Sequence, residues 1–135
     1  MADGSDVSDV TIGVSTDERL EVRDVTDAVA AGLPAGANGT CTVFVEHTTA
    51  GVVVQEAESR LMDDIEDALA SLVPDDGWRH DGLDGNADAH VRATLLGEHV
   101  TVPVSDGAPD MGTWQSILFV ECDGPRERTV RVICE

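Results

Sequence analysis

Residues 40–54 read TCTVFVEHTTAGVVV and contain two predicted β-strands joined by a turn of small and polar residues. In the first strand, over 40–47, cysteine and valine alternate with other residues, and this period of two places them on one face with His47. In the second, three successive valines at 52–54 are typical of a strand buried on both faces. The stretch predicts a β-rich core, with His47 at the end of a buried strand face and a turn that leaves room beside it.

The flanking sequence predicts the remaining elements by its periodicity. Strands are predicted around the alternating Val10, Ile12 and Val14, and over 99–104, 114–122 and 129–134. Helices are predicted from 24–27 to Ala31, over 58–72, and from Asn86 to Leu96. Together they indicate one α+β domain over residues 1–135, with helices packed on a largely antiparallel sheet or sandwich and residues 1–9 as a flexible segment.

The helix over 58–72 has the clearest pattern. Apolar residues at 61, 65, 68 and 72 recur at helical spacing and predict one buried stripe that ends with Leu72. Its polar side then carries Asp63, Glu66 and Asp67, while Asp64 lies on the flank of the stripe.

The charge of the chain excludes several functions. Of its 135 residues, 27 are acidic and 8 are basic, all of them arginine, so the net charge is −19. Without lysine the chain cannot form a Schiff base or supply the lysine of a phosphate-binding P-loop. A pI near 4.1 argues against nucleic acid and anionic membranes as partners. We interpret the acid excess as halophilic adaptation to a salt-rich cytosol, where charges are screened; the alternative is a surface tuned to a basic partner.

The N-terminus and the cysteines indicate a cytoplasmic protein. Residues 1–10 have neither a basic start nor a long apolar run, so neither a signal peptide nor a membrane span is expected. Cys41, Cys122 and Cys134 form no CxxC pair and are odd in number, which favours reduced thiols that fill small apolar positions.

Three of the four histidines are candidate metal ligands. His47, His80 and His90 fall on a strand, a loop and a helix, and three imidazoles match the ligand count of a catalytic zinc site with one open position. The alternative is three unrelated core or surface residues, because the spacing alone does not bring them together. His99 is expected to face solvent.

Other polar residues have two interpretations each. Glu56 and Asp64 are either partners or general bases beside a metal-bound histidine, or ordinary solvated or ion-paired charges. The indole and amide within 112–115 offer a stacking face and a hydrogen-bond fork to a planar ligand, or simply pack. Arg126 and Arg128 either hold phosphate or neutralise carboxylates. The segment 81–86 lacks the oxygen spacing of a calcium-binding EF-hand loop.

Taken jointly, these motifs resemble those of the YjbQ (UPF0047) family. The residues that carry the resemblance are His47-Thr-Thr-Ala-Gly51, Glu56, Trp78-Arg-His-Asp81, Asn86-Ala-Asp-Ala-His90, Leu95-Leu-Gly97, Val102-Pro103, Gly107, Gly112-Thr-Trp-Gln115 and Asp123-Gly-Pro-Arg126. They run in the family's order from about Val10 to the C-terminus. The chain departs from the family at Gln55, where asparagine is common, and at Pro109, where an apolar residue is common.

The resemblance implies a compact β-sandwich-like, jelly-roll-like α+β fold with two or three helices, assembled as a homotrimer. It also implies a divalent metal ion, expected to be zinc, on His47, His80 and His90. Glu56 and Gln115 become candidates for catalytic roles. Candidates for substrate contacts are Thr48, Thr49, Asn86, Trp114 and Arg126.

Family members are labelled secondary thiamine-phosphate synthase, which implies that hydroxymethylpyrimidine diphosphate is joined to thiazole phosphate with release of pyrophosphate. With no lysine in the chain, a metal ion helped by arginine is the expected source of positive charge for the leaving group. The alternatives are another metal-assisted hydrolase or transferase, and a non-enzymatic trimer that binds a metal or small ligand.

Overall fold

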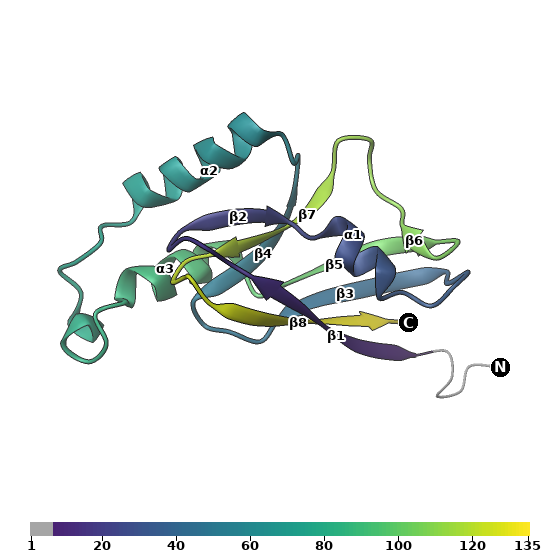
Figure 1. The fold of residues 1–135 in the computed structure, drawn as a ribbon, viewed down its shortest axis with the longest axis horizontal. Coiled ribbons are helices and arrows are strands. Elements are labelled where there is room, and N and C mark those ends of the chain that lie inside the picture. Colours follow the sequence, from purple (N-terminus) through teal and green to yellow (C-terminus); the bar gives the residue numbers. More distant parts are fainter. Residues whose placement is uncertain (1–6) are drawn as a thin grey trace.

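The computed structural model describes residues 7–135 and shows a mixed α+β fold with two antiparallel sheets (Figure 1). The larger sheet has the strand order β1 (Ser8–Ser15), β8 (Glu127–Cys134), β3 (Gly39–Val45), β5 (His99–Ser105) and β6 (Ala108–Pro109). The smaller sheet has the order β2 (Glu21–Asp24), β7 (Ser116–Glu121) and β4 (Ala50–Gln55). The helices are α1 (Thr26–Ala31), α2 (Ser59–Leu72), the 3-10 helix η2 (Arg79–Gly82) and α3 (Ala87–Leu96).

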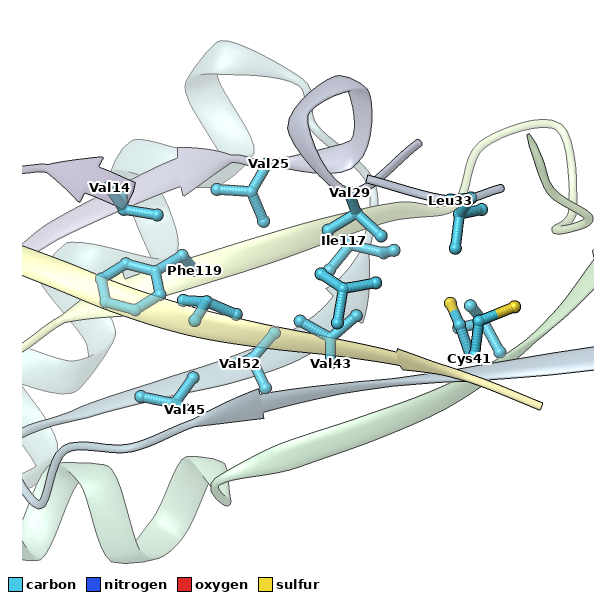
Figure 2. Close-up of a cluster of buried hydrophobic side chains, with 14 of the residues drawn as sticks. Val14, Val25, Val29, Leu33, Cys41, Val43, Val45, Val52, Ile117 and Phe119 are labelled. Atoms are coloured by element: carbon cyan, nitrogen blue, oxygen red, sulfur yellow. The ribbon is translucent and has the colours of Figure 1, made fainter. Parts of the chain in front are cut away.

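The main hydrophobic core lies between the two sheets, in a sandwich-like arrangement. Figure 2 shows Val43 and Val45 of β3 opposite side chains of the smaller sheet, including Val52 and Phe119. These aliphatic and aromatic side chains are buried, so the removal of their surface from water stabilises the contact between the sheets. The predicted β-rich core over residues 40–54 is confirmed.

The smaller sheet is buried on both faces, because α2 and α3 cover the face turned away from the larger sheet. Along β7, Ile117 and Phe119 belong to the core between the sheets, whereas Leu118 and Val120 belong to a second cluster with Leu69 of α2 and residues of α3. This two-sided burial explains why the valines of β4 read as a continuous apolar run.

The predicted stripe of α2 is wrong over the C-terminal half of the helix, where Ala68 and Leu72 are both exposed. Leu72 is 73% exposed, and the helix instead packs through Met62, Ile65 and Leu69. Glu66 lies on this packed side, where its carboxylate accepts a hydrogen bond of 2.9 Å from the backbone N–H of Val22. That N–H belongs to β2, the edge strand of the smaller sheet. Because the outer side of an edge strand has no neighbouring strand, its backbone N–H groups need other hydrogen-bond acceptors.

Several element boundaries also differ from the sequence expectation. β3 ends at Val45 and β7 begins at Ser116, so His47 and Trp114 both lie in the adjoining connections. The short strands β2 and β6 were not predicted, since each has too few residues to display a period. Of the expected flexible segment 1–9, residues 1–6 lie outside the described residues, while Ser8 and Asp9 already belong to β1.

The three cysteines are free, buried thiols. Burial raises the pKa of Cys41 to about 11 and that of Cys122 to about 12. The thiols of Cys41 and Cys122 are therefore protonated at neutral pH. Within residues 7–135, no helix combines the length and apolar character needed to cross a membrane.

Candidate functional site

The turn after β3 packs directly against the corner between α3 and β5. A Cβ at Gly51 would lie 2.8 Å from the carbonyl oxygen of Gly97, so only glycine fits there. The backbone N–H of Val52 donates to that carbonyl at 3.1 Å. The space at Gly51 is thus filled by the chain itself, and the contact brings the His47 turn beside α3, which carries His90.

His47 is anchored by a neighbouring strand. Its Nε2 accepts a hydrogen bond of 3.0 Å from the backbone N–H of Thr129 on β8. Burial lowers the pKa of His47, and the nearby positive charge of Arg128 lowers it further. The ring is therefore neutral near pH 7, and with Nε2 as acceptor its proton is on Nδ1.

His80 and His90 form a contacting pair. Their ring centroids are 4.9 Å apart with an interplanar angle of 82°, an edge-to-face arrangement. The Nε2 of His80 is shielded from solvent and has no hydrogen-bond partner among residues 7–135; the nearest carboxylate oxygen, of Asp84, lies 3.7 Å away. A buried ring nitrogen without a protein partner is uncommon and leaves the lone pair or N–H of His80 for a water or a ligand.

His90 lines three adjoining cavities. Two of them, of about 330 and 390 Å³, are shared with His47 and Thr48. The third, of about 570 Å³, lies between the η2 segment and α3 and is shared with His80. The three predicted histidines therefore surround one region, with His90 in the middle.

The arginines beside the 390 Å³ cavity are already paired with carboxylates. Arg128 is buried and donates to both oxygens of Glu121, and its Nη2 also donates to Thr49 Oγ1 at 2.9 Å. Arg126 donates to Asp123 Oδ2 at 3.0 Å. Because these pairs neutralise each other, the chain itself offers little net positive charge to an anion there.

The remaining predicted contact residues of this region differ in their freedom to bind a ligand. Thr48 is exposed, whereas Thr49 is buried and engaged by Arg128. Asn86 donates through Nδ2 to Asp123 at 3.0 Å, and its Oδ1 is buried without a partner in the described part of the chain. Thr48 and Asn86 therefore keep hydrogen-bonding capacity, and Thr49 has a structural role.

Three other predicted site residues lie at the opposite end of β4 and β7. Gln55 pairs with Ser116 at one end of the two strands and Ala50 pairs with Glu121 at the other, about 17 Å away at about 3.4 Å per residue. Glu56, Trp114 and Gln115 adjoin the first end, and the histidines adjoin the second. Figure 1 shows the connection between β6 and β7 on the side opposite α3. Within one chain, Glu56, Trp114 and Gln115 therefore lie apart from the three histidines.

The side chains at this second end make local contacts. Gln115 Oε1 accepts a hydrogen bond of 2.8 Å from the backbone N–H of Gly112, so the amide closes its own loop. Trp114 is 73% exposed. Asp64 is exposed on α2 and is absent from the walls of the histidine cavities, so its predicted partnership with a histidine has no support.

The donor set fits a metal ion in part. His80 Nε2 lacks a partner and His90 lies against it, but the lone pair of His47 Nε2 is used by Thr129. Across the described residues, no three His, Cys, Asp or Glu side chains form a ready metal-binding group. The three expected ligands surround one region without being assembled into one coordination set.

Comparison with known proteins agrees with the motifs around these cavities. A family model described as UPF0047 protein YjbQ-like matches residues 10–134. The chain belongs to this family. A UPF0047 protein of Methanothermobacter thermautotrophicus is 48% identical over 120 residues, which cover 87% of this chain and 84% of the relative. A UPF0047 protein of Archaeoglobus fulgidus is 47% identical over 120 residues, covering 88% and 94%.

Solved structures of similar proteins share the fold of this UPF0047 chain. A hypothetical protein from Aeropyrum pernix has a TM-score of 0.88 at 47% identity, covering 93% of this chain and 96% of that one. A YbjQ-like protein of unknown function from Sulfolobus solfataricus has a TM-score of 0.85 at 40% identity, covering 95% and 96%.

Sequence reasoning missed two features of this UPF0047 site. One is the buried Glu121–Arg128 pair beside His47, which no local pattern signals because its side chains come from β7 and β8. The other is the wall formed by Trp78 and Arg79 in the 570 Å³ cavity. Their position beside His80 in the motif Trp78-Arg-His-Asp81 was the available signal, but of the first three only the histidine was predicted as a site residue.

Proposed function

We propose that the chain binds a divalent metal ion, expected to be zinc, together with a phosphorylated small molecule in the cavities around His90, and that it has secondary thiamine-phosphate synthase activity. The observation that carries the proposal is the convergence of three imidazoles from separate elements. His80 packs against His90, and His47 lines the same two cavities as His90.

Charge supports the need for a metal. Arg126 and Arg128 are neutralised by Asp123 and Glu121, and the net charge of the chain is −19. In the 390 Å³ cavity these two arginines therefore supply a phosphorylated substrate with little net positive charge. A bound divalent ion supplies the positive charge that stabilises a departing pyrophosphate.

His80 and His90 are the residues best placed to hold the ion. The Nε2 of His80 is without a partner in residues 7–135, and the His90 ring lies against it. His47 is neutral near pH 7 and completes the set by exchanging its bond with Thr129 for the metal.

Other residues of the cavities orient the substrate in this proposal. Arg126 uses Nε and Nη2 on Asp123, which leaves the donors of Nη1 for a phosphate oxygen. The Thr48 hydroxyl and Asn86 Oδ1 add one donor and one acceptor. In the reaction the thiazole nitrogen forms a C–N bond to the pyrimidine methylene carbon as the C–O bond to diphosphate breaks, and the electron pair leaves with pyrophosphate.

A homotrimer belongs to the proposal and would account for the second group of site residues. Leu83 directly follows η2, which carries His80, and is 76% exposed. Leu95 lies in α3, which carries His90, and is 65% exposed. Large exposed apolar side chains near a site favour coverage by another subunit. A neighbouring copy can then present Glu56, Gln115 and Trp114, which one chain keeps apart from its own histidines. We expect a trimeric mass by light scattering, and a monomeric mass would refute this part.

The activity is tested by turnover. Purified protein is supplied with hydroxymethylpyrimidine diphosphate and thiazole phosphate, and thiamine phosphate and pyrophosphate are measured with and without a chelator. We expect chelator-sensitive formation of both products in equal amounts. His90→Ala should abolish it, while Arg60→Gln, on exposed α2, should not.

The result also separates the alternatives. No product from a protein that retains its metal would overturn the synthase and favour a different metal-assisted hydrolase or transferase, or a metal-binding trimer without enzymatic activity. We place the protein in the cytoplasm, because three free buried thiols suit a reducing compartment.

A further inference from the structure

The cavity of about 570 Å³ between the η2 segment and α3 differs in chemistry from the rest of this acidic molecule. Although the chain has 27 acidic residues, none of the described residues that line this cavity is acidic. Its walls include the indole of Trp78, the guanidinium of Arg79, the rings of His80 and His90, and the side chain of Val91.

Arg79 is distinguished by its lack of a counter-ion. Seven of the eight arginines form an ion pair with a carboxylate: Arg19, Arg23, Arg60, Arg92, Arg126, Arg128 and Arg131. Arg79 forms none with any carboxylate in residues 7–135. Arg79 is exposed, so its guanidinium is solvated and available to an anionic ligand that enters the cavity.

Trp78 is held rigidly beside it. Its Nε1–H donates to the carbonyl oxygen of Pro74 at 2.8 Å, and its backbone N–H donates to Asp81 Oδ2 at 3.1 Å. Because the only donor of the indole is used inside the protein, Trp78 can offer a ligand only the surface of its ring. A ring surface with fixed orientation is suited to stacking on a planar aromatic group.

The histidines provide hydrogen bonds at the edge of such a group. His90 lines the cavity, and its ring nitrogens make no hydrogen bond within the described part of the chain. With one ring nitrogen on the metal ion of the proposed function, His90 keeps an N–H donor on the other. A nitrogen acceptor on a planar ring would match this donor better than a hydrocarbon ring would.

We infer that this cavity is a subsite for a planar nitrogen-containing aromatic ring with an anionic substituent, in which the ring stacks on Trp78 and Arg79 binds the anion. The inference rests on the proposed function only in placing the ring beside the metal and phosphate region and in leaving His90 one N–H donor. It assigns the stacking role to Trp78 within one chain, where the sequence had suggested Trp114.

The chain is well suited to a fluorescence test, because it has two tryptophans and no tyrosine. Trp114→Phe leaves Trp78 as the sole indole and keeps an aromatic side chain at 114. Trp78→Phe leaves Trp114 as the sole indole. Both variants are titrated with 4-amino-5-hydroxymethyl-2-methylpyrimidine phosphate, the unphosphorylated pyrimidine, and inorganic phosphate.

We expect saturable quenching of Trp78 by the phosphorylated pyrimidine, weaker affinity for the unphosphorylated ring, and no quenching by phosphate alone. Quenching of Trp114 alone, or of neither tryptophan, would overturn the inference. Thiazole phosphate is titrated as a second phosphorylated ring. Whichever of the two phosphorylated rings, pyrimidine or thiazole, binds more tightly is identified as the one that occupies the subsite.

Calorimetric titration of substituted proteins separates the two contacts. Arg79→Gln should weaken binding of the phosphorylated ring by about tenfold, the loss of roughly one charge-assisted hydrogen bond, and leave the unphosphorylated ring unchanged. Arg60→Gln, on exposed α2, is the matched control and should bind as the unmodified protein does. Trp78→Leu should lose affinity for both rings, and Trp78→Phe should retain most of it. Equal affinities of Trp78→Leu and the unmodified protein would overturn the stacking role.

These outcomes are independent of the proposed function. Ring binding without turnover would refute the synthase and leave the subsite standing. Turnover without quenching of Trp78 would refute the subsite and leave the synthase standing.

Discussion

The imidazoles of His80 and His90 meet edge to face, with ring centroids 4.9 Å apart, although η2 and α3 are separate elements. Asp81 holds the two elements in this relation. Its Oδ2 accepts a hydrogen bond from the backbone N–H of Trp78, and its Oδ1 accepts one of 3.3 Å from that of Ala87, at the start of α3. One carboxylate thus joins the backbone at the start of η2 to the start of α3.

Replacement of Asp81 should loosen this arrangement. Asp81→Ala removes the acceptor of two backbone donors and should lower the free energy of unfolding by about 0.5–2 kcal/mol, as for the loss of a helix cap. Amide hydrogen exchange at Trp78 and Ala87 should become faster, while exchange in β3 stays the same. Unchanged exchange at both amides would show that Asp81 does not position the histidines.

Arg128→Met should destabilise the fold strongly. Arg128 is the buried partner of Glu121, and its removal would leave a buried carboxylate with only Thr16 and a backbone N–H as donors. The expected loss is about 3–5 kcal/mol in urea unfolding. Arg131→Met is the control on the same strand, because its pair with Asp9 is exposed to solvent and should contribute little to stability. Similar losses in both variants would contradict this interpretation.

The main features of the fold were predictable because they depend on local periodicity. The valines of β3 and β4 alternate or run together over enough residues to show which faces are buried. The face of α2 was misjudged because a tertiary contact decides it: Glu66 turns inward to accept from Val22, and no helical pattern records that need.

The candidate site was predictable only as separate motifs. The sequence identified His47, His80 and His90, but their common region depends on the close approach of Gly51 to Gly97. Glu56, Trp114 and Gln115 were grouped with them on family resemblance, yet β4 and β7 separate the two groups by their full length. The lack of a counter-ion at Arg79 could not be read from sequence, because it depends on where every carboxylate lies.

Acid should destabilise the protein through its buried carboxylates. Burial alone would raise the pKa values of Asp88 and Glu121. Hydrogen bonds and attraction to Arg19 and Arg92 nevertheless lower the pKa of Asp88 below its ordinary value of 3.8. Hydrogen bonds and attraction to Arg128 likewise lower the pKa of Glu121 below its ordinary value of 4.5. The unfolded chain therefore takes up protons first as pH falls, so these groups stabilise the fold above their ordinary pKa values and lose that effect as pH falls through the lowered ones.

We expect the free energy of unfolding, measured by urea titration at constant ionic strength, to be lower at pH 3 than at pH 6. The raised pKa of Glu66, which is due to burial, acts in the opposite direction and should reduce the difference slightly. Equal stability at the two pH values would contradict the prediction.

High salt should stabilise the fold. With a net charge of −19, repulsion among exposed acids opposes compaction, and the screening length falls from about 8 Å at 0.15 M salt to about 3 Å at 1 M. The melting temperature in potassium chloride should therefore rise between these concentrations. A variant with asparagine at the exposed Asp63, Asp64 and Asp67 should show a smaller rise. Equal stability in dilute and molar salt would refute the proposed salt adaptation.

The metal content of the purified protein tests the central claim most directly. Elemental analysis after dialysis should find about one divalent ion per chain, and a His47→Ala, His90→Ala double variant should lose it while a His99→Ala variant, altered at an exposed histidine, retains it. Circular dichroism of the double variant shows whether it remains folded. Equal metal content in the unmodified protein and a folded double variant, or no metal in either after incubation with zinc, would contradict the account.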